Sequence, residues 1–179
     1  TNSCFKIRMK IHKIIFSLLS LFKGDIFALR KIYNLKIGKN CRLSKNNYGE
    51  EPYLISMGDH VSAIKVDFIT HDGSVWLWRK ENPDLDFFNS IEIESNIFIG
   101  HKSILLPGTY IESNVIIGAG SVVKGRLLKN SVYAGVPARK ISSTKEYYLK
   151  NVNKFSYTKL MSRKEKREYL MKNLNNFKS

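Results

Sequence analysis

Histidine is the residue type that could do chemistry in this sequence, and the chain has four: His12, His60, His71 and His101. His71 lies between Thr70 and Asp72, where a regularly patterned segment ends and an irregular one begins. Imidazole gains and loses a proton near neutral pH, so a histidine at such a junction can take the proton of a substrate hydroxyl as a general base. The alternative is a structural histidine that caps backbone groups at the end of a strand.

Residues that could bind a metal or a phosphate, or carry an acyl group, do not occur at the spacings of the known motifs for these tasks. The sequence has no metal-ligand pattern, no glycine-rich phosphate loop and no Ser-His-Asp order, so we expect no metal. The two cysteines, Cys4 and Cys41, make a poor disulfide pair because we expect Cys41 to lie inside the fold. A reducing cytoplasm is therefore the expected compartment.

The elements that position His71 follow from a six-residue period. Apolar residues stand six apart without a break: Ile93, Ile99, Leu105, Ile111, Ile117 and Val123. Four positions after each comes a residue that is small or β-branched in every case but the last: Ile97, Ser103, Thr109, Val115, Ser121 and Leu127. Three positions after each, Gly or Asn fills four of six places that need a tolerant backbone: Asn96, Lys102, Gly108, Asn114, Gly120 and Arg126.

A period of six fits neither an α-helix nor a single strand. It predicts short parallel strands wound as a triangular coil, with three hexapeptides to a turn and one apolar residue pointing inward at each corner. The alternative is an open parallel sheet, which we disfavour because no helical crossover separates the strands. We therefore predict an all-β core with helical tails.

The same register is found upstream, with two interruptions. It includes the run Ile37–Arg42 and the triplet Met57, Ala63 and Ile69, with Val61 four after the first. A small loop is expected over 46–52. The larger break, loop 72–90, obeys no period, and its two tryptophans and two phenylalanines argue against disorder.

Three regions follow from these patterns. We predict an amphipathic helical segment over 1–35, a β-helix over 36–141 and a helical tail over 142–179. In the tail we expect one helix around 146–155 and a second that starts at Ser162 with a capping box to Glu165. These helices are expected to cover the open end of the coil.

The net charge of +15 comes mostly from the two tails. It fits solvated helix faces, an anionic ligand with several phosphates or a phospholipid surface; we disfavour nucleic acid because no nucleic-acid module is recognisable. The longest apolar run of the N-terminal segment is too short to span a membrane, and the segment fits a peripheral contact with the inner face of the membrane. It lacks the cleavage site of a signal peptide, so we expect it to be retained.

Several runs resemble the hexapeptide acyltransferases: Ile97–Gly100, Ile104–Gly108, Ile116–Val123 and Ala134–Arg139. They resemble in particular the maltose, galactoside and xenobiotic acetyltransferase branch, whereas Ile69–Gly73 with Val75-Trp76 is similar to the sugar O-acetyltransferases of capsule and O-antigen pathways. The resemblance covers about 36–141. It implies a left-handed parallel β-helix, a homotrimer with active sites between subunits, and acetyl transfer from acetyl-CoA.

The resemblance also implies roles for individual residues. His71 maps onto the catalytic histidine, and Asp72, Trp76 and Trp78 belong to a loop that would hold the sugar acceptor, unless the aromatic rings pack on a neighbouring subunit. Acetyl-CoA would be bound by Gly100, His101, Gly118, Ala119, Lys124, Arg126, Pro137, Arg139 and Lys140. A backbone N–H near Gly100-His101 would hold the oxyanion.

The sequence departs from the family at two places. Lys124-Gly125-Arg126 replaces the usual Thr-Lys-Asp, so the role of the displaced lysine passes to Lys124 or Arg126; His101 replaces a smaller residue, and its side chain has no assigned role. The implied function is O-acetylation of a sugar hydroxyl in the biosynthesis of a surface polysaccharide: a capsule, an O-antigen or an exopolysaccharide. The alternatives are acetylation of a free sugar, amine or antibiotic, and a catalytically silent scaffold.

Overall fold

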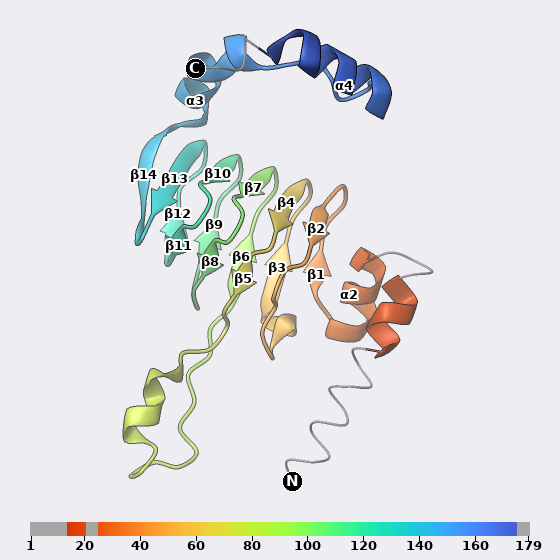
Figure 1. Ribbon diagram of the computed structural model, residues 1–179. Coiled ribbons are helices and arrows are strands. Elements are labelled where there is room, and N and C mark those ends of the chain that lie inside the picture. Colours follow the sequence, from red (N-terminus) through yellow and green to blue (C-terminus); the bar gives the residue numbers. More distant parts are fainter. Residues whose placement is uncertain (1–13, 21–24, 175–179) are drawn as a thin grey trace. The chain divides into compact units, whose positions relative to one another are not determined.

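The computed structural model describes residues 14–20 and 25–174, and its centre is a coil of short parallel strands (Figure 1). Each turn of the coil contributes a strand to one sheet after another. The first sheet contains β1 (Lys36–Ile37), β3 (Ile55–Met57), β6 (Ile91–Ile93), β9 (Tyr110–Ile111) and β12 (Arg126–Leu127). The second contains β2 (Arg42–Ser44), β4 (Val61–Ile64), β7 (Ile97–Ile99), β10 (Val115–Ile117) and β13 (Ser131–Gly135), and the third contains β5 (Asp67–Phe68), β8 (Ile104–Leu105) and β11 (Val122–Val123).

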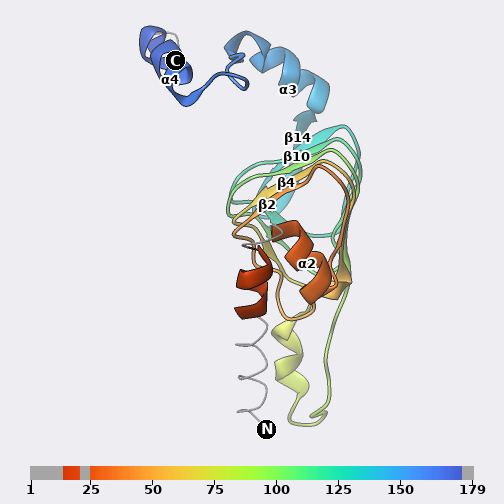
Figure 2. The same ribbon diagram turned by 90° about the vertical axis from the view of Figure 1, so that its right-hand side faces the viewer.

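This arrangement is the predicted left-handed parallel β-helix. From β3 onward, chain order visits the first, second and third sheets in rotation, and the strands of successive turns pair in parallel. Viewed along the axis of the coil, successive turns lie one behind another (Figure 2). β14 (Ala138–Ser143) ends the stack by pairing antiparallel with β13. The fold prediction is confirmed.

The core of the coil consists of the residues that the period selected. All six apolar residues from Ile93 to Val123 are buried, and so are the six that follow each of them by four positions. The buried hydroxyls among the latter are satisfied at their own corner: Ser103 Oγ donates to the Gly100 carbonyl at 2.8 Å, and Ser121 Oγ donates to the Gly118 carbonyl at 2.7 Å. A small polar residue is therefore tolerated inside, because its partner is three residues back.

The predicted turn positions have left-handed backbone with one exception. The φ angle is positive at Asn96, Lys102, Gly108, Asn114 and Gly120. At the sixth corner Gly125 has the positive φ in place of Arg126, and Leu127 pairs with Ile111. The chain is thus two residues shorter from Val123 to Leu127 than from Leu105 to Ile111, and Leu127 fills an apolar corner of the next unit.

The count also shifts in the first half. Ile69 is only partly buried, whereas Phe68 is fully buried and pairs with Leu105. The inward residue of this corner is therefore Phe68, and the prediction for Ile69 was wrong by one position. This corner has one residue fewer than the six-residue period predicts. The Phe68 ring fills the space, because it reaches further into the core than the Ile69 side chain would.

The N-terminal end of the core is covered by α2 (Asp25–Tyr33), whose Leu29 is buried with the coil residues. Arg30 fixes this helix, because its Nη2 donates to the carbonyls of Ile37 at 2.6 Å and Gly38 at 2.8 Å. Residues 14–20 are also helical, as predicted. The other residues expected in that helix, including Ile11, His12 and Phe22, lie outside the described residues, as does Cys4.

The two interruptions form ordered loops. The first contains the short 3-10 helix η1 (Pro52–Leu54), and the second contains η2 (Gly73–Trp78). In Figure 1 the second loop is the yellow-green arm that points away from the coils. Both loops leave the coil next to the third sheet, so they can contribute side chains to the same corner.

Residues from 145 onward form a separate compact unit. It contains α3 (Thr144–Asn151), the 3-10 helix η3 (Val152–Lys154) and α4 (Arg163–Lys172). The predicted capping box is present: Ser162 Oγ accepts from the Glu165 N–H, and Glu165 Oε2 accepts from the Ser162 N–H. Neither α3 nor α4 buries a side chain, so covering of the coil's end by these helices stays a prediction.

Candidate active site

His71 stands at the base of the long loop, where the chain leaves the third sheet. It forms an antiparallel bridge with Phe88 on the returning strand of the loop. On either side, the Asp72 N–H donates to the Phe87 carbonyl at 3.0 Å, and the Asn89 N–H donates to the Thr70 carbonyl at 2.9 Å. The loop is therefore clamped at its base, which holds the histidine backbone in place.

A carboxylate that the sequence analysis missed orients the imidazole. Glu51 Oε2 lies 3.0 Å from His71 Nδ1 and also accepts from the buried Thr70 hydroxyl at 2.8 Å. The Glu51 side chain is 13% exposed and that of His71 is 44% exposed. Because an ionised carboxylate only accepts hydrogen bonds, Nδ1 carries the proton and Nε2 keeps the lone pair of a general base.

No pattern in the sequence announces Glu51. It lies 20 positions before His71, just ahead of η1, in the loop that interrupts the count at 46–52. The interruption was the only signal, because an insertion into a regular coil is often functional. The pairing itself depends on two loops that leave neighbouring turns of the coil.

A pocket of about 480 Å³ opens beside His71. It is lined by Ile69, His71–Gly73, Phe87, Asn89, Leu106–Gly108 and Lys124-Gly125. Of the predicted site residues it brings together His71, Asp72 and Lys124. Asn89 and Pro107 were not predicted as site residues. We call this region the His71 corner.

Asp72 has a structural partner as well as a place at the pocket. Its Oδ1 accepts from the Ser74 N–H at 2.9 Å and caps η2. This backbone hydrogen bond is the largest cause that lowers the pKa of Asp72, and Lys124 and His71 add to it, so the carboxylate is ionised at neutral pH. Trp76 and Trp78 follow in η2, with 73% and 54% of their surface exposed, and they do not line the pocket.

Arg126 is engaged elsewhere. Its Nε and Nη2 both contact Glu112 Oε1, at 2.7 and 2.6 Å, and its guanidinium lies over the Tyr110 ring. The hydrogen bond that Arg126 donates to Glu112 raises the pKa of Arg126, whose charge is thereby paired. Of the two residues that could replace the family's lysine, Lys124 is the one at the pocket.

Gly100 and Gly118 lie at a different corner, between the second and third sheets, which we call the glycine corner. A Cβ on Gly100 would lie 2.3 Å from the Ala119 nitrogen, and one on Gly118 would lie 2.9 Å from the Ala134 Cβ. These glycines therefore let successive coils touch. The Gly100 N–H donates to the Ile117 carbonyl at 2.8 Å, so this N–H is engaged within the coil, and an oxyanion donor elsewhere near Gly100-His101 stays a prediction.

The remaining predicted residues are exposed near the glycine corner and beyond it. His101 and Ala119 lie in turns of the coil, and Pro137 lies in the turn between β13 and β14. Arg139 and Lys140 are exposed on β14, where Arg139 pairs with Ala134 in register. None of these residues lines the pocket at the His71 corner.

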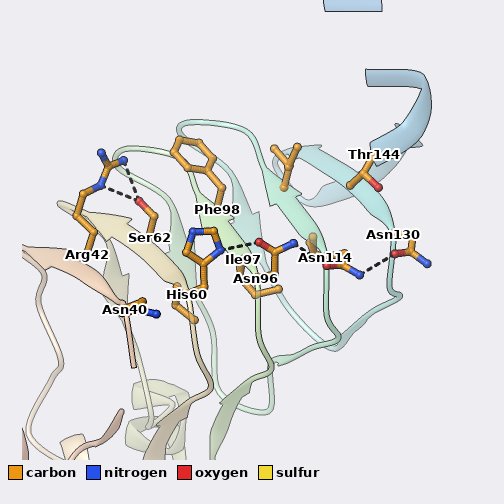
Figure 3. A pocket seen from close by; sticks show the side chains of 13 residues that line it. Asn40, Arg42, His60, Ser62, Asn96, Ile97, Phe98, Asn114, Asn130 and Thr144 are labelled. Carbon is orange, nitrogen blue, oxygen red and sulfur yellow. Dashed lines mark hydrogen bonds between the residues drawn. The ribbon is translucent and has the colours of Figure 1, made fainter. Parts of the chain in front are cut away.

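A larger hollow, of about 780 Å³, lies on the second sheet (Figure 3). One edge is a ladder in which His60 Nδ1 meets Asn96 Oδ1 at 2.7 Å, Asn96 donates to Asn114 at 2.6 Å, and Asn114 donates to Asn130 at 3.0 Å. These groups satisfy one another, and their backbones have the positive φ of the coil corners. We attribute the ladder to the corner geometry of the coil.

Within 14–20 and 25–174, no group of three His, Cys, Asp or Glu residues could hold a metal ion. No helix in the same ranges is long and apolar enough to cross a membrane.

Known proteins resemble this chain in sequence. A family model described as bacterial transferase hexapeptide (six repeats) matches residues 90–125. Protein CapG of Staphylococcus aureus is 44% identical over 154 residues, which cover 84% of this chain and 87% of that protein. The galactoside O-acetyltransferase of Escherichia coli (strain K12) is 33% identical over 123 residues, which cover 66% of this chain and 60% of that protein.

A solved structure resembles the chain in fold. It is a hexapeptide-repeat-containing acetyltransferase from Vibrio cholerae O1 biovar eltor, complexed with acetyl coenzyme A. The TM-score is 0.57 at 18% identity, over 76% of this chain and 88% of that one.

Proposed function

The chain belongs to the family of bacterial transferases with hexapeptide repeats and is an acyltransferase, and on this premise we propose that it transfers an acetyl group from acetyl-CoA to a sugar hydroxyl. We place the reaction in the biosynthesis of a surface polysaccharide: a capsule, an O-antigen or an exopolysaccharide. The similarity to a galactoside O-acetyltransferase supports a sugar acceptor. The run Ile69–Gly73, which resembles the capsule and O-antigen enzymes, supports the polysaccharide setting.

The observation that carries the proposal is the Glu51–His71 pair. Glu51 accepts from Nδ1, which leaves Nε2 as the nitrogen that a substrate can use. Nε2 takes the proton of the acceptor hydroxyl while the hydroxyl oxygen forms a bond to the acyl carbon. When the carbon–sulfur bond breaks, Nε2 returns this proton to the departing sulfur. Glu51 stabilises the imidazolium between the two steps.

Acetyl-CoA supplies a thioester whose acyl carbon is activated for attack by a hydroxyl. Lys124 at the pocket, and Arg139 with Lys140 on β14, are exposed cations suited to its phosphates. Ala119 and Gly118 present a surface without bulky side chains, which suits an extended pantetheine arm. The acceptor sugar would meet Asp72 and Asn89 as polar partners at the pocket. Trp76 or Trp78, which lie on the same loop outside the pocket, would stack on the sugar unless a neighbouring copy covers these rings.

We propose a homotrimer because one chain separates these residues between two corners. Contact between the His71 corner of one copy and the glycine corner of the next would unite the base with the acetyl-CoA residues. The exposed Trp76, Trp78, Phe87 and Phe88 of the loop form an apolar surface that a neighbouring copy would cover. Sedimentation decides between the states: a fully active monomer at nanomolar concentration would contradict the trimer.

We further propose that the enzyme works in the cytoplasm, with its N-terminal segment at the inner face of the membrane. Cys41 is a free thiol, which fits a reducing compartment. In the described part of the N-terminal helix, Ile14, Ile15 and Leu18 are exposed, as an interfacial helix requires.

The test measures release of free CoA thiol from acetyl-CoA with a panel of acceptors. The panel contains a nucleotide-linked sugar, a lipid-linked sugar, a free galactoside, an amine and an aminoglycoside, and His71→Ala is the matched control. Turnover with a linked sugar that His71→Ala loses supports the proposal. Turnover confined to the free compounds would make the protein a small-molecule acetyltransferase, and absence of turnover with every acceptor would leave a silent scaffold.

A further inference from the structure

The C-terminal unit shows its apolar side chains to solvent. In the segment between η3 and α4, Tyr157 is 88% exposed and Leu160 is fully exposed at a turn; Phe155 and Met161 are exposed beside them. In α3, Tyr147, Tyr148 and Leu149 are exposed as well. Helices of 8 and 10 residues that bury no side chain are short for independent stability, so an apolar environment outside the unit is expected to support them.

The same unit is strongly basic. Residues 145–174 contain nine basic and three acidic residues, whereas 36–144 contain 13 basic and 11 acidic residues. The exposed turn is bracketed by cations, with Lys154 and Lys159 around Tyr157, and Arg163 and Lys164 directly after Met161. Positive charge and exposed apolar groups therefore occupy one short stretch of chain.

The segment is held in a defined conformation. The Tyr148 and Phe155 rings pack with centroids 5.7 Å apart, and the Met161 N–H donates to the Thr158 carbonyl at 3.3 Å. Thr158 is buried, and the capping box at Ser162 fixes the start of α4. The contacts that fix this turn therefore also hold the side chains of Tyr157 and Leu160 in exposed positions.

We propose that this turn, residues 155–161, inserts into the interface of an anionic lipid bilayer. Tyrosine and leucine are suited to the boundary between headgroups and acyl chains, and lysines beside them can reach the lipid phosphates. A second copy of the unit would be repelled by its like charge. A nucleic acid would use the cations but would leave Leu160 and Met161 in water. An anionic bilayer can bind the cations with its phosphates and bury the apolar side chains among its acyl chains.

The experiment is cosedimentation of the full chain with vesicles of phosphatidylcholine alone and with 30% phosphatidylglycerol. We expect binding to the anionic vesicles that weakens with added salt. Lys154, Lys159, Arg163 and Lys164 changed together to Gln should reduce partitioning at least about 10-fold. The matched control changes Lys36, Lys45, Lys65 and Lys102 on the coil to Gln and should retain binding.

A second variant separates insertion from charge alone. Tyr157→Ser with Leu160→Ser leaves the net charge unchanged and should also reduce partitioning, about 10-fold. Unchanged vesicle binding in both C-terminal variants would overturn the proposal and assign any membrane contact to the N-terminal segment. The proposal would also be overturned if the parent chain did not bind vesicles but bound RNA or itself, and the variants lost that binding. Acetyl transfer with a water-soluble acceptor should be the same in all variants, so this result is independent of the proposed reaction.

Discussion

The His71 corner and the glycine corner are built from the same repeat, yet the glycine corner also uses glycine in a second way. At the His71 corner Gly108 and Gly125 have φ of +79° and +77°, so glycine serves the turn and leaves space for a pocket. At the glycine corner Gly120 serves the turn in the same way, with φ of +70°, but Gly100 and Gly118 have no positive φ and lie against the next coil. The His71 corner has a pocket lined by polar side chains. At the glycine corner, Gly100 and Gly118 let successive coils pack in contact and leave no bulky side chain.

The contrast between the two corners shows that the role of a residue depends on the corner of the coil at which it lies. The inserted loops leave the coil at the His71 corner, and they bring Glu51, His71 and Asn89 to one place. The glycine corner has no insertion, and Arg139 and Lys140, the outer cations proposed for the CoA phosphates, are exposed on β14. Four variants, one of them a double substitution, test this contrast.

The largest effect is expected for His71→Ala. Removal of the general base should lower kcat by about 10²–10⁴-fold, while the fold and binding of CoA persist. His101→Ala, an exposed histidine at the glycine corner, is the matched control and should change kcat little. Steady-state kinetics with the preferred acceptor measure both variants. The assignment fails if His101→Ala abolishes turnover and His71→Ala does not.

Gly100→Ala tests whether the glycine corner is closed. The new methyl group would meet backbone atoms of Ala119 and Gly118, which cannot move aside as a flexible side chain can. We expect a loss of about 3 kcal/mol, seen as a fall of about 6–12 °C in the midpoint of thermal unfolding. Gly73→Ala is the control, because no atom lies within 4 Å of a Cβ there. Equal midpoints for the two variants would refute the steric role.

Glu51→Gln tests whether the carboxylate acts through His71. An amide in its place can donate to Nδ1 and so favour the tautomer with the proton on Nε2, which is the wrong one for a base. We expect kcat to fall by about 10–100-fold with little change in either KM. Glu51→Asp should recover part of the rate. A change confined to unfolding temperature would make Glu51 a purely structural partner.

Arg139→Ala with Lys140→Ala tests the outer cations. Contacts with phosphates far from the thioester bind ground state and transition state alike, so the KM for acetyl-CoA should rise about 3–10-fold while kcat changes less. Lys36→Ala, an exposed lysine on β1, is the control. An unchanged KM in the double variant would remove β14 from the cofactor site.

The pattern of residues predicted much of the coil, because its repeat is local. The apolar residues that stand six apart from Ile93 to Val123 face inward because of their local spacing, independently of the rest of the chain. Most of the corners between them are marked by Asn or Gly. The count failed at Ile69 and Arg126, where one turn is a residue short and another two residues short. Sequence spacing does not show such shortening, since Phe68 or Gly125 can close the corner equally well.

The site was predictable only in part. His71 was recognisable as a candidate because a repeat ends there and because Ile69–Gly73 resembles a known family, and both features can be read in the sequence. Glu51 was not, because its contact with His71 joins two separate loops. Nor was the pairing of Arg126 with Glu112, since these residues become neighbours through stacking of β9 and β12.

By itself, the sequence determined the coil, its corner residues, the capped helix at Ser162 and the position of one histidine, because each depends on the few residues around it. Only the tertiary structure decided which carboxylate orients His71, which cation stands at its pocket, and that the other predicted acetyl-CoA residues do not line that pocket. Winding places residues 18 apart in register, so contacts across the stack depend on the exact length of every turn.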